Sequence, residues 1–384
     1  MQITKGMNEL VYLDNAATTK PCQAAVDAAV EAMTVNFGNP SSLHRAGLNA
    51  QLAVDKARKL IADAIGAESS NITFTSGATE SNNLALRGAA AAYGRKKHRI
   101  VASSVEHASV DETLSALEKQ GFEVVRVAPA EDGRFRPADF VAACNEDTVM
   151  VTMMYVNNET GYVLPVKEAF SAIKRRYPDI ITHTDCVQAF MKLPVKANTL
   201  CADLISLSGH KIHGVKGVGA LYIRKGVRVL PIVTGGKQEK GIRSGTESVP
   251  LIAAFGAAVE QLQPTITERY DRVAALKTHL LELIADAENV TVNSPEDGSP
   301  YVVNLSAVGK RSEIMLHFLE SREIYVSSGS ACSKGQQSGV LGEFGITGKR
   351  ADSAIRVSMT AETTAEELEI FAEALREGME KVRG

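Results

Sequence analysis

The stretch that decides the fold is Asp203-Leu-Ile-Ser-Leu-Ser208-Gly209-His210-Lys211-Ile-His-Gly-Val-Lys-Gly-Val-Gly-Ala-Leu-Tyr-Ile-Arg224. It begins with a short apolar run, continues through a polar loop rich in glycine, and ends in a second β-rich run. This pattern predicts two strands joined by a loop. Lys211 lies in that loop, just after the first strand, and follows the hydroxyl of Ser208 and the imidazole of His210.

Lys211 has two interpretations. An amine at a strand end, beside a hydroxyl, an imidazole and glycines, suggests a lysine held against a phosphate and an aldehyde. A pyridoxal phosphate (PLP) enzyme needs this arrangement, with the lysine as its Schiff-base amine. The alternative is a glycine-rich hairpin with a solvated lysine, and the segment alone leaves both interpretations open.

Strand and helix patterns alternate in the sequence before this stretch. Apolar, β-rich runs predict strands at 72–75, 100–102, 122–127, 148–156, 180–184 and 203–208. Helical patterns lie at 21–34, at 48–65, through residue 92 after a tight turn at 76–80, at 109–120 and after Pro165, and Gly66 ends the second of them. This alternation predicts an α/β fold with a mainly parallel, seven-stranded type of sheet and helices on both faces.

The pattern changes after residue 249. A long helical region to about residue 288 is followed by strands at 290–292, 301–305, 324–327 and 355–358 and helices at 312–320 and 365–382. This order predicts a compact α+β domain. We therefore expect an N-terminal arm over residues 1–20 that packs with the small domain, a large domain over 21–260 and the small domain over 261–384.

Polar residues stand just after the predicted strands of the large domain. They are Thr79, His107, Asn158, Asp185 and Lys211. In open sheets of this kind the ligand lies at the carboxyl ends of the strands. Their shared position therefore predicts one composite site.

Several of these residues have both a chemical and a structural interpretation. Asp185 could pair with a protonated pyridine nitrogen while Gln188 donates to the ring's phenolic oxygen, or it could only cap a helix. The segment Ser76-Gly77-Ala78-Thr79 could bind a phosphate at a helix N-terminus, or be an ordinary cap. His107 could stack on a flat cofactor and move protons, or be structural.

Two residues near the C-terminus could also carry chemistry. Cys332 lies in a small, polar segment, where Lys334 favours the thiolate, so we expect a reactive thiol. Arg356 lies inside an apolar strand, where it would meet a carboxylate bidentately or be an edge-strand arginine. The other four of the five cysteines are expected to be buried thiols, and no cysteine spacing indicates a metal site.

The composition excludes several classes of function. A net charge of −3 gives no bulk attraction to nucleic acid, and no apolar run reaches the length of a membrane span. The first ten residues are polar and lack the apolar core of a signal peptide. We therefore expect a cytoplasmic protein that contacts neither nucleic acid nor membrane directly.

Taken together, these segments resemble the cysteine desulfurases of the class V aminotransferase family, which are PLP enzymes of fold type I. The resemblance covers nearly the whole chain. Its motifs, in order, are Tyr-Leu-Asp-Asn-Ala-Ala-Thr-Thr, Gly-Asn-Pro-Ser-Ser-Leu-His, Phe-Thr-Ser-Gly-Ala-Thr-Glu-Ser, Glu-His, Asn-Asn-Glu-Thr-Gly, Asp185-x-x-Gln188, Ser-Gly-His-Lys, Arg-Ser-Gly-Thr and Ser-Ser-Gly-Ser-Ala-Cys. Fold type I implies a large PLP-binding domain and a smaller α+β domain that carries the catalytic cysteine.

The resemblance implies roles at the ring of the cofactor. Lys211 would carry PLP, and Asp185 and Gln188 would hold the pyridinium nitrogen and the phenolic oxygen. His107 would stack on the ring and help to move protons.

The resemblance also implies how the phosphate and the substrate are bound. The phosphate ligands would be Ala78, Thr79, Ser208, His210 and, from the other subunit of a homodimer, Thr246. Asn158 would contact the cofactor and the substrate. Arg356 and Asn39 would bind the substrate.

The implied reaction removes sulfur from L-cysteine. It gives L-alanine and a persulfide on Cys332, which passes its sulfur to a protein acceptor in iron–sulfur cluster assembly or another thiolation pathway. The alternatives are a related PLP-dependent lyase or aminotransferase, such as a selenocysteine lyase or a cystine lyase, and a non-enzymatic scaffold. The chain departs from the family pattern in the loop after Cys332 and at 357–361, where the family usually has a Gly-Arg pair.

Overall fold

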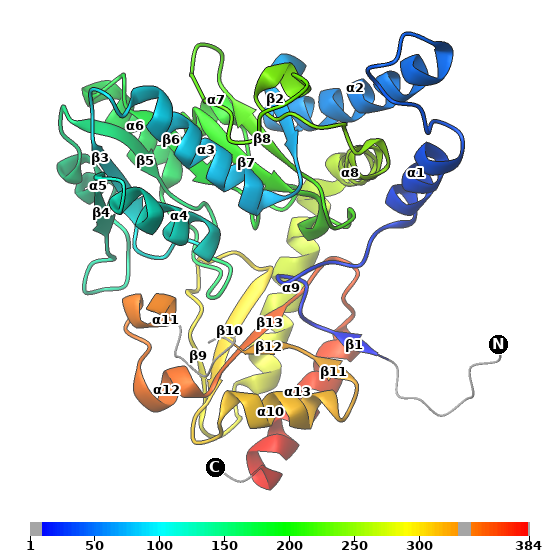
Figure 1. The fold of residues 1–384 in the computed structure, drawn as a ribbon. Helices are drawn as coiled ribbons and strands as arrows, with labels where there is room; N and C mark the ends of the chain where they lie inside the picture. The colour runs from blue at the N-terminus through cyan, green and yellow to red at the C-terminus, as the bar shows by residue number, and fades with distance from the viewer. Residues whose placement is uncertain (1–9, 329–338, 383–384) are drawn as a thin grey trace. The chain divides into compact units, whose positions relative to one another are not determined.

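The computed structural model describes residues 10–328 and 339–382 (Figure 1). The chain forms two compact units. The large unit comprises residues 19–156 and 164–266, and the small unit comprises residues 1–18, 157–163 and 267–384. The chain thus leaves the large unit at residue 157 and returns to it at residue 164.

A seven-stranded sheet forms the centre of the large unit, in the order β2-β8-β7-β6-β5-β3-β4. Its strands are β2 (Ile72–Thr75), β3 (Arg99–Ser103), β4 (Glu123–Val127), β5 (Thr148–Thr152), β6 (Ile181–Asp185), β7 (Leu204–Ser208) and β8 (Gly219–Ile223). The pairs from β7 through β6, β5 and β3 to β4 are parallel, and β8 is antiparallel to both neighbours. The predicted mainly parallel sheet is confirmed, with β8 as its reversed strand.

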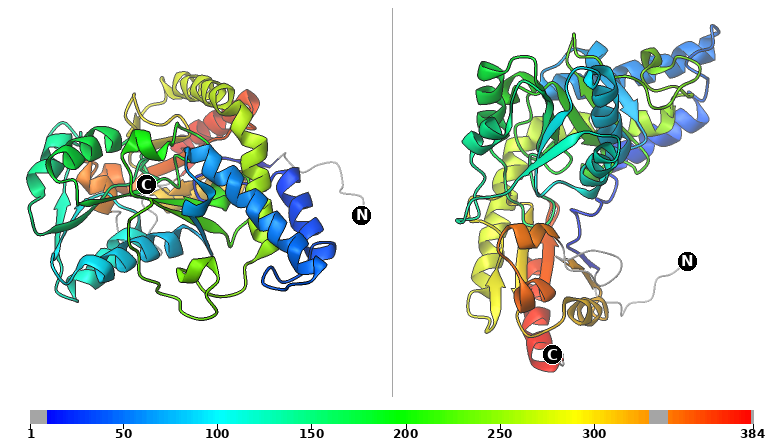
Figure 2. Two further views of the ribbon diagram at one scale, coloured as in Figure 1. Left: turned by 90° about the horizontal axis from the view of Figure 1, so that it is seen from above. Right: turned by 60° about the vertical axis from the view of Figure 1, so that its left-hand side comes forward.

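Helices cover both faces of this sheet, as the view from above shows (Figure 2, left). The helices of the large unit are α1 (Gln23–Thr34), α2 (Arg45–Ile65), α3 (Ala78–Tyr93), α4 (Ala108–Glu118), α5 (Pro137–Ala143), α6 (Val166–Arg176), α7 (Ala197–Leu200) and α8 (Val249–Leu262). Gly66 ends α2 with a left-handed backbone, at φ 67°, as the sequence predicts.

The central strands are buried along their whole length because helices cover the sheet on both sides. Every residue of β5, β6 and β7 is buried, including the polar ones. One of these buried polar residues is His183, whose ring nitrogens lie 2.8 Å from Thr152 Oγ1 and 3.0 Å from Ser206 Oγ. Burial lowers the pKa of His183 to about 3, so this histidine stays neutral inside the sheet.

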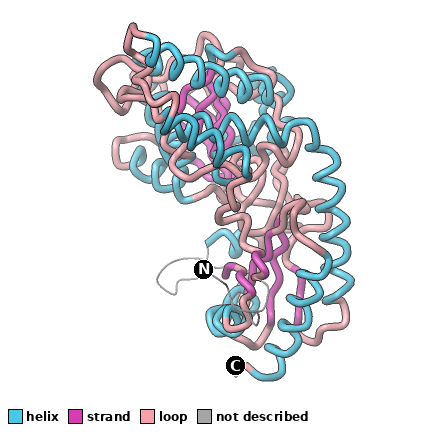
Figure 3. The backbone as a smooth tube through the Cα atoms, turned by 90° about the vertical axis from the view of Figure 1, so that its right-hand side faces the viewer, coloured by secondary structure: helices cyan, strands magenta, loops and turns pink. Residues whose placement is uncertain are grey.

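The small unit is built on a second, four-stranded sheet, whose strands are magenta in Figure 3. Its order is β12-β13-β10-β9, and all its pairs are antiparallel. The strands are β9 (Val290–Val292), β10 (Val302–Ala307), β12 (Ser327–Ser328) and β13 (Ala354–Ser358), and β1 (Val11–Tyr12) pairs separately with β11 (Ile324–Tyr325) in parallel. The helices are α9 (Ile266–Ile284), which begins at the end of the large unit, α10 (Ser312–Glu320), α11 (Gly339–Glu343), α12 (Gly348–Asp352) and α13 (Ala365–Lys381).

The structure differs from the sequence-based expectations at several element boundaries. The strand predicted at 148–156 ends at Thr152, because the chain beyond it turns into the segment 157–163 of the small unit. The run predicted as one strand at 324–327 is divided between β11 and β12, which belong to different sheets. The short helices α5, α7, α11 and α12 were not predicted, because helices of four to seven residues show little helical periodicity in the sequence.

Candidate active site

Lys211 ends a short 3₁₀ turn, Gly209–Lys211, that follows β7 directly. Thr19 holds this turn on both sides. Its backbone N–H and its hydroxyl donate to the carbonyl of His210, at 2.9 and 3.0 Å, and the N–H of His213 donates to its hydroxyl at 2.7 Å. The backbone just before Lys211 and the backbone just after it are therefore fixed by one buried threonine.

The residues before Lys211 suit an anion. Ser208 is buried, and its hydroxyl has no hydrogen-bond partner within the described part of the chain. Burial, together with the charges of Lys211, Lys216 and Lys192, lowers the pKa of His210 to about 4, so the ring is neutral at pH 7. A buried hydroxyl without a partner is destabilising, and a bound phosphate oxygen would satisfy it.

The N-terminus of α3 provides a second anion-binding element. Gly77, at φ 154°, is the residue before the helix, and Ala78 and Thr79 are its first residues. A Cβ at Gly219 of β8 would lie 2.7 Å from the carbonyl carbon of Gly77 and 2.7 Å from the oxygen of Leu207. Glycine at 219 therefore allows β8 to run directly against this turn, so that the helix N-terminus lies at the edge of the sheet.

The loop that carries Thr246 is tied to the same helix. Arg243 Nε donates to Glu80 Oε1 at 2.9 Å, and Glu80 Oε2 accepts the N–H of Ser76 at 2.7 Å. Although burial opposes the shift, the bonds from Arg243 and Ser76 keep the pKa of Glu80 below its usual value, so the carboxylate stays charged. Thr246 itself is exposed.

Asp185 ends β6 and is buried. Its carboxylate accepts Asn82 Nδ2 at 2.7 Å and the N–H of Val187 at 2.9 Å. Gln188, three residues further along, accepts Lys192 Nζ at 3.2 Å through its side-chain oxygen. The strand end and helix α3 therefore hold an oriented carboxylate of the kind that a pyridinium nitrogen needs.

His107 lies after β3 and caps the N-terminus of α4. Its Nδ1 is 2.8 Å from Ser109 Oγ and accepts the N–H of Ser109 at 3.1 Å, while the residue is exposed. One edge of the ring is thus anchored, and the rest is accessible.

Glu106, next to His107, is a buried acid. Its Oε1 accepts the N–H of Met154 at 2.7 Å and the hydroxyl of Ser103, and Oε2 has no partner among the residues described. Burial raises the pKa of Glu106 to about 8, although its two hydrogen bonds oppose the shift. The nearby charge of Asp185 adds to the increase, so the group holds a proton at neutral pH.

Arg356, on β13 of the small unit, is also buried. Its Nη2 donates to Asp14 Oδ1 at 2.8 Å and its Nη1 to the carbonyl of Asn158 at 3.1 Å. The buried Nε has no partner in the described residues. Arg356 thus meets the carboxylate of Asp14, through Nη2 and not in the bidentate manner that the sequence suggested, and one donor remains for a further acceptor.

Seven of the predicted residues lie at strand ends or helix starts of the large unit: Ala78, Thr79, His107, Asp185, Ser208, His210 and Lys211. Hydrogen bonds through Asn82 and Ser109 link Asp185 to His107. Arg356 and Asn158 meet in the small unit. Asn39 lies in the exposed loop between α1 and α2, where its side-chain oxygen accepts the N–H of Ser41 at 2.9 Å. Cys332 lies outside the described residues.

Among the residues that hold Lys211, Asp185 and His107 in place, Thr19, Asn82 and Ser109 were not predicted from the sequence. Asn82 and Thr19 bond to residues 103 and 191 positions away, so no local pattern indicates their partners. A sequence signal existed only for Ser109, which lies two residues after His107, at the start of the predicted helix.

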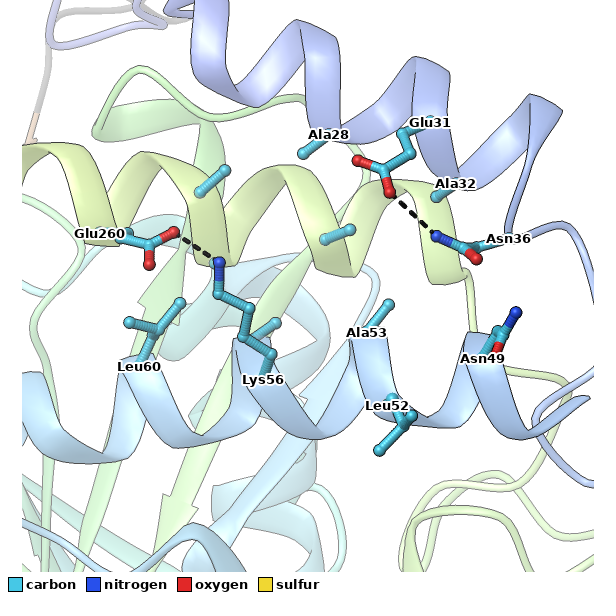
Figure 4. Close-up of a pocket in the computed structure, with 14 residues that line it drawn as sticks. Ala28, Glu31, Ala32, Asn36, Asn49, Leu52, Ala53, Lys56, Leu60 and Glu260 are labelled. Atoms are coloured by element: carbon cyan, nitrogen blue, oxygen red, sulfur yellow. Dashed lines mark hydrogen bonds and ion pairs between the residues drawn. The ribbon is translucent and has the colours of Figure 1, made fainter.

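A groove of about 500 Å³ lies elsewhere in the large unit, between α1, α2 and α8 (Figure 4). Small residues such as Ala28, Ala53 and Gly256 are among those that line it. At its rim Lys56 pairs with Glu260 at 2.8 Å, and Glu31 accepts Asn36 at 3.1 Å. None of the candidate residues lines it, so it is not the catalytic site.

The residues fit PLP. Lys211 offers an amine, Asp185 an oriented carboxylate, and Ser208 and the start of α3 offer donors for a phosphate. The described residues contain no group of three or more potential metal ligands. No helix within 10–328 and 339–382 is long and apolar enough to cross a membrane.

The fold and the site therefore define an α/β protein with a lysine-centred site at the carboxyl edge of its sheet. Residues 11–371 match the family model of aminotransferase class V, and the chain belongs to this family. The family is PLP-dependent in general.

Individual relatives are similar over nearly their whole length. The cysteine desulfurase IscS of Dictyoglomus turgidum is 39% identical over 381 residues, covering 98% of this chain and 96% of the relative. The IscS of Methanosarcina thermophila is 38% identical, covering 98% and 93%. Among solved structures, a NifS-like protein superposes with a TM-score of 0.92 at 33% identity, covering 97% of this chain and 99% of that chain.

Proposed function

We propose that this protein is a PLP-dependent cysteine desulfurase, which converts L-cysteine to L-alanine and transfers the sulfur to Cys332. The observation that carries the proposal is the joint placement of Lys211 and Asp185. Lys211 follows β7 and Asp185 is the last residue of β6, and these neighbouring parallel strands end at the same edge of the sheet. The similarity to relatives named cysteine desulfurase supports the choice of substrate.

The residues of the large unit would hold the cofactor. When bound, PLP supplies an electron-accepting ring that stabilises negative charge at the α-carbon of an amino acid. Lys211 would provide the Schiff-base amine, and Asp185 and Gln188 would bind the ring. The phosphate would be bound by the start of α3 at Ala78 and Thr79, together with Ser208, His210 and the partner's copy of Thr246.

Other residues would bind and desulfurate the substrate. Arg356 and Asn158 of the small unit would bind the carboxylate of cysteine, and Asn39, in the loop between α1 and α2, would also contact the substrate. The Cys332 thiolate would form a bond to the substrate sulfur as the carbon–sulfur bond breaks. The electron pair of the broken bond would remain with carbon, which takes up a proton and leaves as alanine. The persulfide sulfur would then pass to a protein acceptor.

An exposed apolar surface supports the proposal of a homodimer. It consists of Val26, Val30, Met33, Val35, Phe37, Leu43, Leu48 and Leu52, from α1, α2 and the loop between them. Large apolar side chains that gather on neighbouring exposed elements often mark an interface, and a stable dimer buries about 800 Å² on each partner. We propose that a second copy of this chain covers this apolar surface.

The cytoplasmic location expected from the sequence remains a prediction.

The test is the release of alanine from L-cysteine by the purified, PLP-loaded protein with a reductant present. We expect repeated turnover, and we expect Cys332→Ala to abolish it while Cys22→Ala, at a free cysteine outside the site, leaves it intact. Activity on selenocysteine or cystine with Cys332 dispensable would instead support a related lyase. Protein that binds no PLP would contradict the proposal.

A further inference from the structure

Two buried side chains connect His107 with Asp185. Ser109 Oγ lies 2.8 Å from Nδ1 of His107 and 2.9 Å from Nδ2 of Asn82. The same Asn82 nitrogen lies 2.7 Å from Oδ2 of Asp185. Asn82, Ser109 and Asp185 are each less than a tenth exposed, so these hydrogen bonds are shielded from competing water.

The direction of each hydrogen bond follows from the chemistry of the groups. A backbone N–H can only donate, so Nδ1 of His107 accepts from the N–H of Ser109 and carries no proton. The Ser109 hydroxyl therefore also donates to Nδ1, and its oxygen is left to accept from Asn82. A carboxylate can only accept, which fixes the Asn82 amide with its NH₂ toward both Asp185 and Ser109.

We propose that Ser109 and Asn82 are positioning residues that hold the neutral His107 ring in one tautomer, with its proton on Nε2, and couple that ring to the carboxylate of Asp185. The proposal deepens the proposed function, on which its catalytic consequence rests. Neither residue contacts the reacting atoms in the assignment above, since both act through His107 and Asp185.

The tautomer determines what His107 can do. With Nδ1 engaged, the accessible edge of the ring presents an N–H donor, suited to an anionic acceptor such as a thiolate or carboxylate of the substrate. A ring in this state cannot take a proton at Nε2 unless its bonds to Ser109 rearrange. The first role of His107 is therefore to donate a hydrogen bond, and any proton transfer requires the link to open.

The direct test is nuclear magnetic resonance of protein labelled with ¹⁵N in the histidine rings, with and without PLP. The His107 signals are assigned by their loss in His107→Gln, and the coupling pattern reports which nitrogen holds the proton. We expect the Nε2–H tautomer in the wild type. A proton on Nδ1 of the neutral ring would overturn the proposal.

Variants test the link itself. In Ser109→Ala we expect a mixture of tautomers, since only the backbone donor remains, and Ser109→Thr should restore the single form. Ser115→Ala, on the same helix but facing Arg126, is the control and should change nothing. An unchanged tautomer in Ser109→Ala would show that the hydroxyl is not a determinant and overturn the proposal.

Kinetics provide a second readout. Loss of one such bond should lower kcat by about three- to tenfold in Ser109→Ala, with little change in KM. If the two residues act through one link, the double variant Ser109→Ala with Asn82→Ala should lower kcat no more than the single variant with the larger effect. If the fold-decreases in kcat of the two single variants multiply in the double variant, the coupling is overturned.

The two proposals fail in different ways. If the protein has no desulfurase activity but shows the expected tautomers, the link between His107 and Asp185 stands and only the proposed desulfurase function is contradicted. A protein that forms alanine while Ser109→Ala leaves both tautomer and kcat unchanged would contradict only the link.

Discussion

Arg356 donates from Nη2 to Oδ1 of Asp14 at 2.8 Å, joining β13 to the turn after β1 across 342 positions of sequence. The carbonyl of Asn158 accepts a second guanidinium bond, at 3.1 Å. These two bonds fix the plane of the guanidinium. The buried Nε, which has no partner among the described residues, is left in a defined direction. Asp14 thus both neutralises and orients the arginine that we assign to the substrate carboxylate.

Replacing Arg356 should therefore weaken substrate binding. In Arg356→Gln we expect KM for L-cysteine to rise about 10- to 100-fold, since a hydrogen bond to a charged group contributes about 1.5–3 kcal/mol. Steady-state kinetics measure this change. Arg376→Gln, at an arginine paired with Asp286 away from this turn, is the control. An unchanged KM in Arg356→Gln would remove this residue from the substrate site.

The orientation of Arg356 by Asp14 gives a second prediction. Asp14→Asn keeps a hydrogen-bond acceptor but removes the charge, so we expect a smaller rise in KM, about three- to tenfold. Asp14→Ala should have a larger effect than Asp14→Asn. If both variants bind cysteine as tightly as the wild type, the ion pair serves only the stability of the small unit.

The acid Glu106 should make stability depend on pH. An acid whose pKa is raised on folding, here from 4.5 to about 8, binds more protons in the folded than in the unfolded state between these values. The free energy of unfolding therefore falls as pH rises through this window. Glu106→Gln lacks the titrating group, so its stability relative to the wild type should increase by on the order of 2–4 kcal/mol between pH 5 and pH 8.

Urea unfolding of the PLP-free proteins at pH 5, 7 and 8.5 measures this difference. Glu112→Gln, at an exposed position of the same helix region, is the matched control and should follow the wild type at every pH. If the free energies of unfolding of Glu106→Gln and of the wild type change with pH in the same way, Glu106 does not hold a proton in the folded state.

The close contact at Gly219 predicts a defect in cofactor binding. In Gly219→Ala the new Cβ would lie 2.7 Å from the backbone of Gly77, so the turn before α3 has to move. Forcing one methyl group into a packed site typically destabilises by about 1–3 kcal/mol, and we expect PLP affinity to fall at least tenfold. Gly342→Ala, where a Cβ has open space, is the control. Unaltered PLP binding would exclude this turn as a phosphate site.

The sequence predicted what depends on local pattern. The positions of β2 and α10 and the stop at Gly66 follow from periodicity and from glycine, and each matches the structure. The placement of Lys211 and Asp185 at one sheet edge follows from the parallel topology. Local pattern does not contain the partners of Thr19 or Asn82, because these depend on how distant segments meet. Nor does it show that β8 reverses direction, which requires the loop geometry around Lys211.

The exposed side chains of α1, α2 and their connecting loop give the last prediction. Phe37 is 72% exposed and Leu43 is fully exposed, so in a monomer both would present apolar area to water. If they lie in a homodimer interface, Phe37→Asp combined with Leu43→Asp should weaken association at least 100-fold, because each apolar side chain contributes about 1.5–3 kcal/mol when buried. Sedimentation equilibrium measures the change, and Ile370→Asp, at a partly exposed position of α13, is the control. A wild-type protein that is monomeric at micromolar concentration would contradict the dimer, while a variant that still dimerises would place the interface on another surface. Because Thr246 would act on the partner's phosphate, dissociation should also lower PLP affinity, which the control should leave unchanged.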